Sequence, residues 1–154
     1  PVVWGMLSTP KRGWILAWAH QLTGDEKYLE GLIRLTQPGL GANPLNLCYT
    51  AGLGENPVRR VMQFDAWASC QPVPEGLSVG GPADMRLYPA QSDRGRRRPW
   101  PIWVFAKHMH PDLLNWPATE SYFDCMRWAP MHEFVVSSTI ADNAHAWAYL
   151  AARP

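Results

Sequence analysis

Glu133 is the residue in this sequence whose surroundings point most directly to chemistry. It lies between Met131 and Phe134, and two valines follow at 135–136. A carboxyl group among apolar neighbours is desolvated, which favours its neutral form and raises its pKa. A carboxyl that stays protonated near neutral pH can act as a general acid, although a simply solvated glutamate is the common alternative. Local context alone therefore makes Glu133 a candidate proton donor without naming the reaction.

Other short motifs lack the context that their chemistry requires. Residues 76–80 match the G-x-S-x-G motif of serine hydrolases, but Pro82 follows where a helix would have to begin. Residues 132–133 read His-Glu, the start of H-E-x-x-H, yet residue 136 is Val. The histidines at 108 and 110 would face the same way only on a strand, and no partner cluster is evident. We therefore expect no serine nucleophile and no metal site.

The composition sets limits on the class of protein. The chain has 154 residues, a formal net charge of +1 and 47% hydrophobic residues, which suits one globular domain. The near balance of charge argues against a general nucleic-acid binder. No apolar run reaches the roughly 18 residues of a membrane-spanning helix, and no signal peptide is visible. Because the sequence opens at Pro1 without a start Met, we expect a fragment of a longer chain, and localisation stays open.

Residues 1–37 have the pattern of a helical hairpin. Ser8 to Pro10 provide a start signal, and Trp14, Trp18 and Leu22 follow at helical spacing as an apolar stripe. Thr23–Asp25 separates this helix from a second one that ends near residue 38. We expect Trp14 and Trp18 to lie in the core, together with Trp147 from a final helix.

Residues 38–117 differ from both ends. They contain eleven prolines and eight glycines, a density that no long helix tolerates, and several aromatic residues. We predict long, ordered, aromatic-rich loops with short strands near 77–79 and 102–105. Residues 118–154 then provide the segment with Glu133 and a final helix. The prediction is one all-α domain over 1–154 whose central loops carry the active site.

The order of several motifs resembles the C-terminal part of the catalytic domain of glycoside hydrolase family 9. The resemblance covers about residues 14–152. Its pieces are a helix-turn-helix, a glycine-asparagine-proline segment, a G-x-G region, a P-x-P-x-x-x-x-V-G-G-P loop and an acid-bearing segment: Gln21–Leu29, Gly41–Leu45, Tyr49–Gly54, Pro72–Pro82, Trp116–Asp124 and Met131–Phe134.

This resemblance implies an (α/α)6 barrel, of which the chain would be a C-terminal fragment. It also implies hydrolysis of β-1,4-linked glucan-type chains with inversion, either cellulase-like or exo-glucosaminidase-like. Glu133 would protonate the leaving oxygen. The carboxylate base, about 6.5–9.5 Å away in inverting enzymes, would come from a part of the protein missing here, because no D-x-x-D-like motif occurs. The fragment alone should then be inactive.

Candidate sugar contacts follow from the same resemblance and from the flat apolar face that a pyranose offers to an aromatic ring. Arg59, Arg60 and Asp65 are candidate polar contacts. The candidate aromatic platforms are Trp116, Tyr122 and Trp128.

The sequence also departs from the family pattern. A His is common near the position of Arg59–Arg60, Gln63–Asp65 replaces a more polar, histidine-bearing stretch, and His132 stands where Asn usually precedes the acid. These departures keep two alternatives open: a non-catalytic carbohydrate-binding or degenerate remnant, and an α-helical structural domain. We expect a β-linked oligosaccharide or polysaccharide as partner, no nucleic acid, no membrane and no cofactor. Some family members hold structural calcium, but no D-x-D-x-D loop occurs here.

Overall fold

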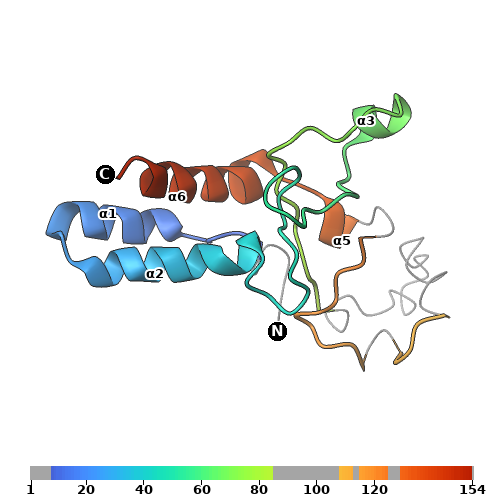
Figure 1. The fold of residues 1–154 in the computed structure, drawn as a ribbon, viewed down its shortest axis with the longest axis horizontal. Helices are drawn as coiled ribbons and strands as arrows, with labels where there is room; N and C mark the ends of the chain where they lie inside the picture. The colour runs from blue at the N-terminus through green and yellow to red at the C-terminus, as the bar shows by residue number, and fades with distance from the viewer. Residues whose placement is uncertain (1–7, 85–107, 113–114, 125–128, 154) are drawn as a thin grey trace, which may run out of the picture.

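The computed structural model describes residues 8–84, 108–112, 115–124 and 129–153. Figure 1 shows three helices lying side by side at one end and irregular chain with short helices at the other. Among the described residues, pairing of extended chain is confined to two isolated bridges, Cys48 with Pro57 and Thr50 with Ser78. The strand predicted at 77–79 is therefore reduced to one bridge, and the one predicted at 102–105 lies outside the described residues.

The hairpin consists of α1 (Gly13–Thr23) and α2 (Glu26–Thr36). Gly24 has a positive φ of 68°, and its N–H donates to the carbonyl of His20, which closes the first helix. The carboxylate of Asp25 accepts a hydrogen bond from the amide of Lys27 at 3.1 Å and caps the second. The break expected at Thr23–Asp25 is thus present, with Gly24 closing the first helix and Asp25 capping the second.

The start of α1 differs from the prediction. The helix begins at Gly13, after Arg12 in the left-handed region, and has no side-chain cap. Ser8 is buried, and its hydroxyl donates to the carbonyl of Gly80 at 3.0 Å. A tertiary hydrogen bond thus takes the group that local sequence assigns to capping.

The third long helix, α6 (Ala141–Ala151), packs on α1 and α2 and follows a π-helical turn, η5 (Val136–Ile140). Ala17, Leu32 and Ala146, all fully buried, form the centre of this helical layer. Because Ala17 on α1 and Ala146 on α6 have small side chains, these two helices can approach each other closely.

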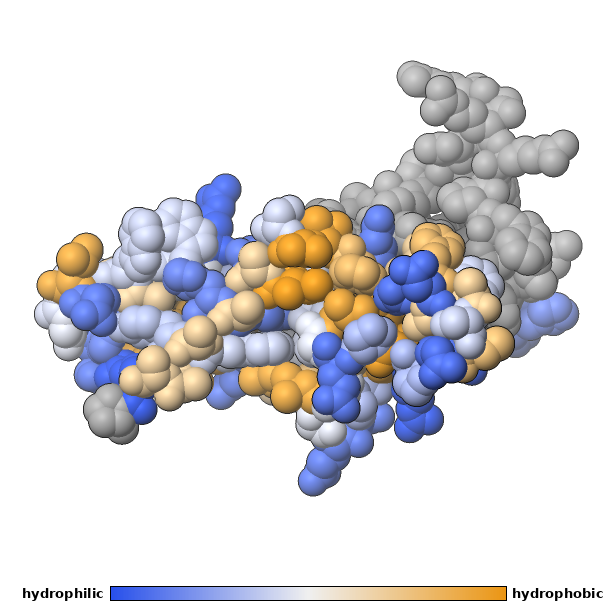
Figure 2. Space-filling model, turned by 90° about the horizontal axis from the view of Figure 1, so that it is seen from above, coloured by the Kyte–Doolittle hydropathy of each residue, from blue (hydrophilic) through white to orange (hydrophobic). Residues whose placement is uncertain are grey.

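The apolar stripe of α1 faces outward, so the prediction that Trp14 and Trp18 are core residues is wrong. Trp14 is 40% exposed, Trp18 59% and Leu22 83%, while α1 buries Gly13, Ala17 and His20 instead. Trp147 is half-buried against the core of the helical layer. Helical periodicity identifies an apolar face, but it does not say which neighbour covers that face. Figure 2 shows a further group of hydrophobic side chains open to solvent, near the middle of the face seen from above.

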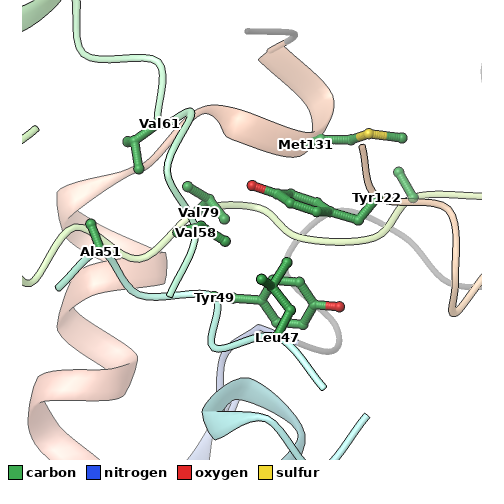
Figure 3. Packing of buried hydrophobic residues seen from close by; sticks show 9 residues of the cluster. Leu47, Tyr49, Ala51, Val58, Val61, Val79, Tyr122 and Met131 are labelled. Atoms are coloured by element: carbon green, nitrogen blue, oxygen red, sulfur yellow. The ribbon is translucent and has the colours of Figure 1, made fainter. Parts of the chain in front are cut away.

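A second core organises the proline- and glycine-rich region (Figure 3). It lies among η1 (Gln37–Leu40), α5 (Ala129–His132) and the loops between them, while the short helix α3 (Phe64–Ala68) projects away from it. Its buried members come from distant parts of the sequence: Leu47, Tyr49, Ala51, Val58, Val61, Val79, Ala83, Tyr122 and Met131. The described loops are therefore held by a core of their own, which explains how a region so rich in proline and glycine is ordered there.

Within the described residues, no helix has both the length and the apolar character to span a membrane.

Candidate functional site

Backbone hydrogen bonds fix the segment that contains Glu133. The carbonyl of Glu133 accepts from the amide of Gly80 at 2.8 Å, and that of Met131 accepts from Gly81 at 2.9 Å. Between them, the carbonyl of His132 accepts from the amide of Met62 at 2.7 Å. Three consecutive carbonyls are thus bonded to two separate loops, so the position of Glu133 is set by the loop core.

The side chain of Glu133 is exposed, and this corrects the expectation of apolar surroundings. Met131 and His132 are buried, whereas Phe134 and Val135 are only half-buried. The segment turns at the end of α5, which directs its buried residues into the core and Glu133 toward solvent. Apolar neighbours in sequence therefore do not desolvate this carboxyl within the described chain.

His132 is the buried polar residue of the segment, with no exposed surface. Its Nε2 lies 3.0 Å from the carbonyl oxygen of Phe123, and because a carbonyl can only accept, Nε2 is the donor. Its ring lies 4.9 Å from the ring of Tyr122, measured between centroids. His132 therefore fastens the acid-bearing segment to residues 122–123.

Asp124 holds the turn that presents Arg59 and Arg60. Its two carboxylate oxygens accept from the backbone amides of Arg59 at 2.8 Å and Arg60 at 2.9 Å. Both arginine side chains are exposed, while their backbone is held in place by Asp124. Sequence reasoning missed Asp124, although it closes the Trp116–Asp124 motif of the family resemblance. The bonds link this motif, the Arg59–Arg60 turn and, through His132, the segment with Glu133.

Asp65 is exposed in the first turn of α3. This short helix projects from the rest of the described chain in Figure 1. Phe64 and Trp67 flank Asp65, and their rings are stacked with centroids 6.1 Å apart and planes 22° apart.

The three predicted aromatic platforms have different outcomes. Tyr122 is only 4% exposed and packs edge-on against Tyr49, so its ring is a core element and offers no open face. Trp116 is half-buried, donates from Nε1 to the carbonyl of Pro111 at 2.9 Å, and meets Phe123 at right angles. Trp128 lies outside the described residues.

Burial also sets the protonation of the core phenols. Desolvation raises the pKa of Tyr122 well above its ordinary value, and the charge of Asp124 adds to this effect. Desolvation likewise raises the pKa of Tyr49. Both phenols therefore stay neutral well above physiological pH and serve as packing groups rather than as acids or bases.

An open hollow of about 340 Å³ lies elsewhere, on the helical layer. Its lining consists of Trp14, Trp18, Ala141, Asp142 and His145. Partial burial raises the pKa of Asp142 above its ordinary value. None of the residues predicted to contact sugar lines this hollow. Among the described residues, no three His, Cys, Asp or Glu side chains gather closely enough to hold a metal ion.

Comparisons with known proteins locate the chain among solved folds. No family model matches it, and no curated protein does. A crystal structure of a metagenome-derived glycoside hydrolase family 9 endoglucanase matches 91% of this chain and 21% of its own, with a TM-score of 0.62 and 24% identity. A single mutant of a thermostable endoglucanase from Alicyclobacillus acidocaldarius matches 94% of this chain and 26% of its own, with a TM-score of 0.60 and 23% identity.

These similarities concern the fold. Both solved structures are below 25% identity, and the chain spans about a quarter or less of their length. The predicted fold class, an all-α fragment of an (α/α)6 barrel, is confirmed by the helical architecture and by these neighbours.

Proposed function

We propose that this chain forms part of an inverting glycoside hydrolase that acts on β-1,4-linked glucan-type chains, with Glu133 as the general acid. The observation that carries the proposal is the fold shared with endoglucanases over more than nine-tenths of the chain. The ordered series of family-like motifs also supports the proposal. In addition, three backbone hydrogen bonds fix the position of the acid-bearing segment.

An exposed carboxyl suits a proton donor that must reach a large substrate. In the proposed step, the Glu133 carboxyl transfers its proton to the glycosidic oxygen as the bond to the sugar carbon breaks. Water attacks that carbon from the opposite face, and a carboxylate base takes a proton from the water. Because Glu133 is solvated within the described chain, the desolvation that a general acid needs must come from bound sugar and from other parts of the protein.

Arg59 and Arg60 are the proposed polar contacts to sugar hydroxyls. Asp124 holds their backbone amides, and His132 joins the same region to the acid-bearing segment. The base is proposed to lie in a portion of the protein outside this chain. Whether the unit cleaved is glucose or glucosamine follows from contacts outside it as well.

The test is Glu133→Gln in the complete protein, assayed on β-1,4-glucan and on chito-oligosaccharide. Gln keeps the size of the side chain but has no carboxyl proton to donate, so we expect turnover to fall by about 10²-fold or more. Glu30→Gln on α2, an exposed residue remote from this segment in sequence, is the matched control and should keep full turnover.

Undiminished turnover in Glu133→Gln contradicts the assignment. Binding of oligosaccharide with no turnover in the unaltered complete protein would instead favour the non-catalytic carbohydrate-binding alternative. That alternative draws on two departures from the family pattern, the missing His near Arg59 and the change at His132.

A further inference from the structure

Two large aromatic side chains on α3 are open to solvent. Phe64 is 63% exposed and Trp67 is 51% exposed. Their rings are nearly parallel, 22° apart, and so share one orientation. Neighbouring exposed rings offer flat apolar surface that a ligand can remove from water.

The helix that carries them is anchored despite its short length. Ala66 is buried, and its carbonyl accepts from the amide of Gln71 at 2.9 Å. The hydroxyl of Ser69 donates to the carbonyl of Asp65 at 2.6 Å. These bonds hold Phe64 and Trp67 on a defined backbone, so their rings are presented at a fixed place.

That place is close to the proposed acid. The amide of Met62, two residues before Phe64, donates to the carbonyl of His132, one residue before Glu133. With 3.8 Å between consecutive alpha carbons, the alpha carbons of Phe64 and Glu133 lie within about 18 Å of each other. A chain of linked sugars that reaches Glu133 could therefore also reach α3.

Asp65, the polar neighbour of the two rings, restricts the class of ligand that could bind there. The exposed carboxylate of Asp65 lies between them in sequence and can accept hydrogen bonds from hydroxyl groups. It repels phosphate and other anions at short range. Aromatic faces beside a hydroxyl acceptor suit a neutral pyranose, which combines an apolar face of C–H groups with a rim of hydroxyls.

We propose that Phe64, Asp65 and Trp67 form a sugar-binding subsite that takes a neutral β-linked glycan by stacking. The proposal rests on the proposed function for its place beside the acid. It goes beyond that function because the family resemblance leads one to expect polar, histidine-bearing chain here, whereas this chain presents an apolar ring at Phe64. The subsite thus adds stacking on two rings to the hydrogen bonds that Asp65 can accept.

The experiment measures binding of cellohexaose and of chitohexaose to the complete protein by calorimetry. We expect Trp67→Ala and Phe64→Ala each to weaken binding by about tenfold or more. Trp67→Phe keeps an aromatic ring and should retain most of the affinity of the unaltered protein. The matched control is Trp18→Ala, because Trp18 is 59% exposed but lies edge-on to Trp14, at 72°, on a different element.

Three outcomes overturn the proposal: no binding by the unaltered complete protein, equal binding by Trp67→Ala, or an equal loss in Trp18→Ala. Near-UV circular dichroism checks that each variant keeps its fold. The test is separate from that of the proposed function. Full turnover by Glu133→Gln would remove the acid assignment, while ring-dependent binding at α3 would still stand.

Discussion

Two buried phenols in the loop core differ in one detail that decides their energetics. Tyr49 and Tyr122 lie edge-on, with ring centroids 5.4 Å apart. The hydroxyl of Tyr122 donates to the carboxylate of Asp124 at a long 3.4 Å. The buried hydroxyl of Tyr49 finds no hydrogen-bond partner in the part of the chain that the structure describes. A buried, unsatisfied hydroxyl lowers stability, because it has lost its bonds to water without replacing them.

We therefore predict that Tyr49→Phe increases the free energy of unfolding by about 1 kcal/mol at pH 7. The ring and its packing remain, and only the unsatisfied oxygen is lost. Urea unfolding followed by fluorescence measures the change. Tyr122→Phe is the control, and it should be neutral or destabilising because it gives up a bond to Asp124. A less stable Tyr49→Phe would show that the hydroxyl has a partner after all.

The same pair sets the stability of the chain in alkali. Burial raises the pKa of both phenols in the folded state, so the folded chain keeps protons that the unfolded chain loses above about pH 10. Stability must then fall as pH rises beyond 10 and be unaffected by these groups below it. Tyr49→Phe should lessen that alkaline loss, which unfolding curves at pH 9 and pH 11 would measure.

At the residue scale, the sequence predicts the chemical role of a side chain better than it predicts whether that side chain is buried or exposed. The apolar neighbours of Glu133 predict a desolvated carboxyl, yet only Met131 among them is buried, Val136 is 68% exposed, and Glu133 itself is exposed. The sequence predicts an open ring at Tyr122, whereas the structure buries this ring in the core. The role of Asp124 could not be predicted, because nothing local distinguishes a solvated aspartate from one that accepts from two amides some 65 positions away. In each case a long-range contact decides the outcome.

At the scale of elements, the turn around Gly52 shows how closely loops approach in this fold. The amide of Ala51 donates to the carbonyl of Leu77 at 3.0 Å, and the amide of Gly76 donates to the carbonyl of Ala51 at 2.8 Å. Gly52 has a φ of 73°, and a Cβ there would lie 2.4 Å from Cγ and 2.8 Å from Cβ of Glu75. The second atom is next to the backbone and cannot swing away, so the two loops meet this closely only because residue 52 is glycine.

Gly52→Ala should therefore cost more stability than backbone strain alone explains. Gly24→Ala is the matched control: Gly24 has a φ of 68°, and a Cβ there would meet nothing within 4 Å. We expect a loss of about 1–2 kcal/mol for Gly24→Ala from the left-handed backbone, and about 2 kcal/mol more for Gly52→Ala from the clash. Chemical denaturation of both variants gives the comparison. Equal losses would mean that the 75–76 loop gives way without cost.

The elements themselves divide into those set by local signals and those that are not. The hairpin break at Gly24–Asp25 could be predicted, because a left-handed cap and an aspartate cap act within a few residues. The start of α1 could not, since the Ser8 hydroxyl bonds to Gly80, 72 residues away. The burial of Ala17 rather than Trp18 could not be predicted either, because it depends on α6 packing against the face of α1 that carries Ala17.

At the scale of the whole molecule, the described chain has two cores, and one residue makes hydrogen bonds to both sides. The helical core gathers around Ala17, Leu32 and Ala146, and the loop core gathers around Tyr49. Ser8 lies between them. Its hydroxyl donates to the carbonyl of Gly80 in the loop core, and its own carbonyl accepts from the buried amide of Asn143 on α6 at 3.3 Å. This arrangement makes Ser8 a mechanical link between the helices and the loops that carry the proposed site.

We predict that Ser8→Ala loosens the loop core while leaving the helices nearly unchanged. The variant leaves the buried carbonyl of Gly80 without its donor, which we expect to cost about 1–3 kcal/mol, and the loss falls on the loop side because the bond from Asn143 to the backbone of residue 8 survives. Hydrogen exchange separates the two sides: the amide of Val79, bonded to the carbonyl of Tyr49, should exchange faster, while that of Leu32 in α2 should not. Ser69→Ala is the matched control, because its hydroxyl also donates to a carbonyl but only four residues away and at the surface. If Val79 and Leu32 accelerate equally in Ser8→Ala, the cores unfold as one unit, and the loops owe their order to the whole fold rather than to a core of their own.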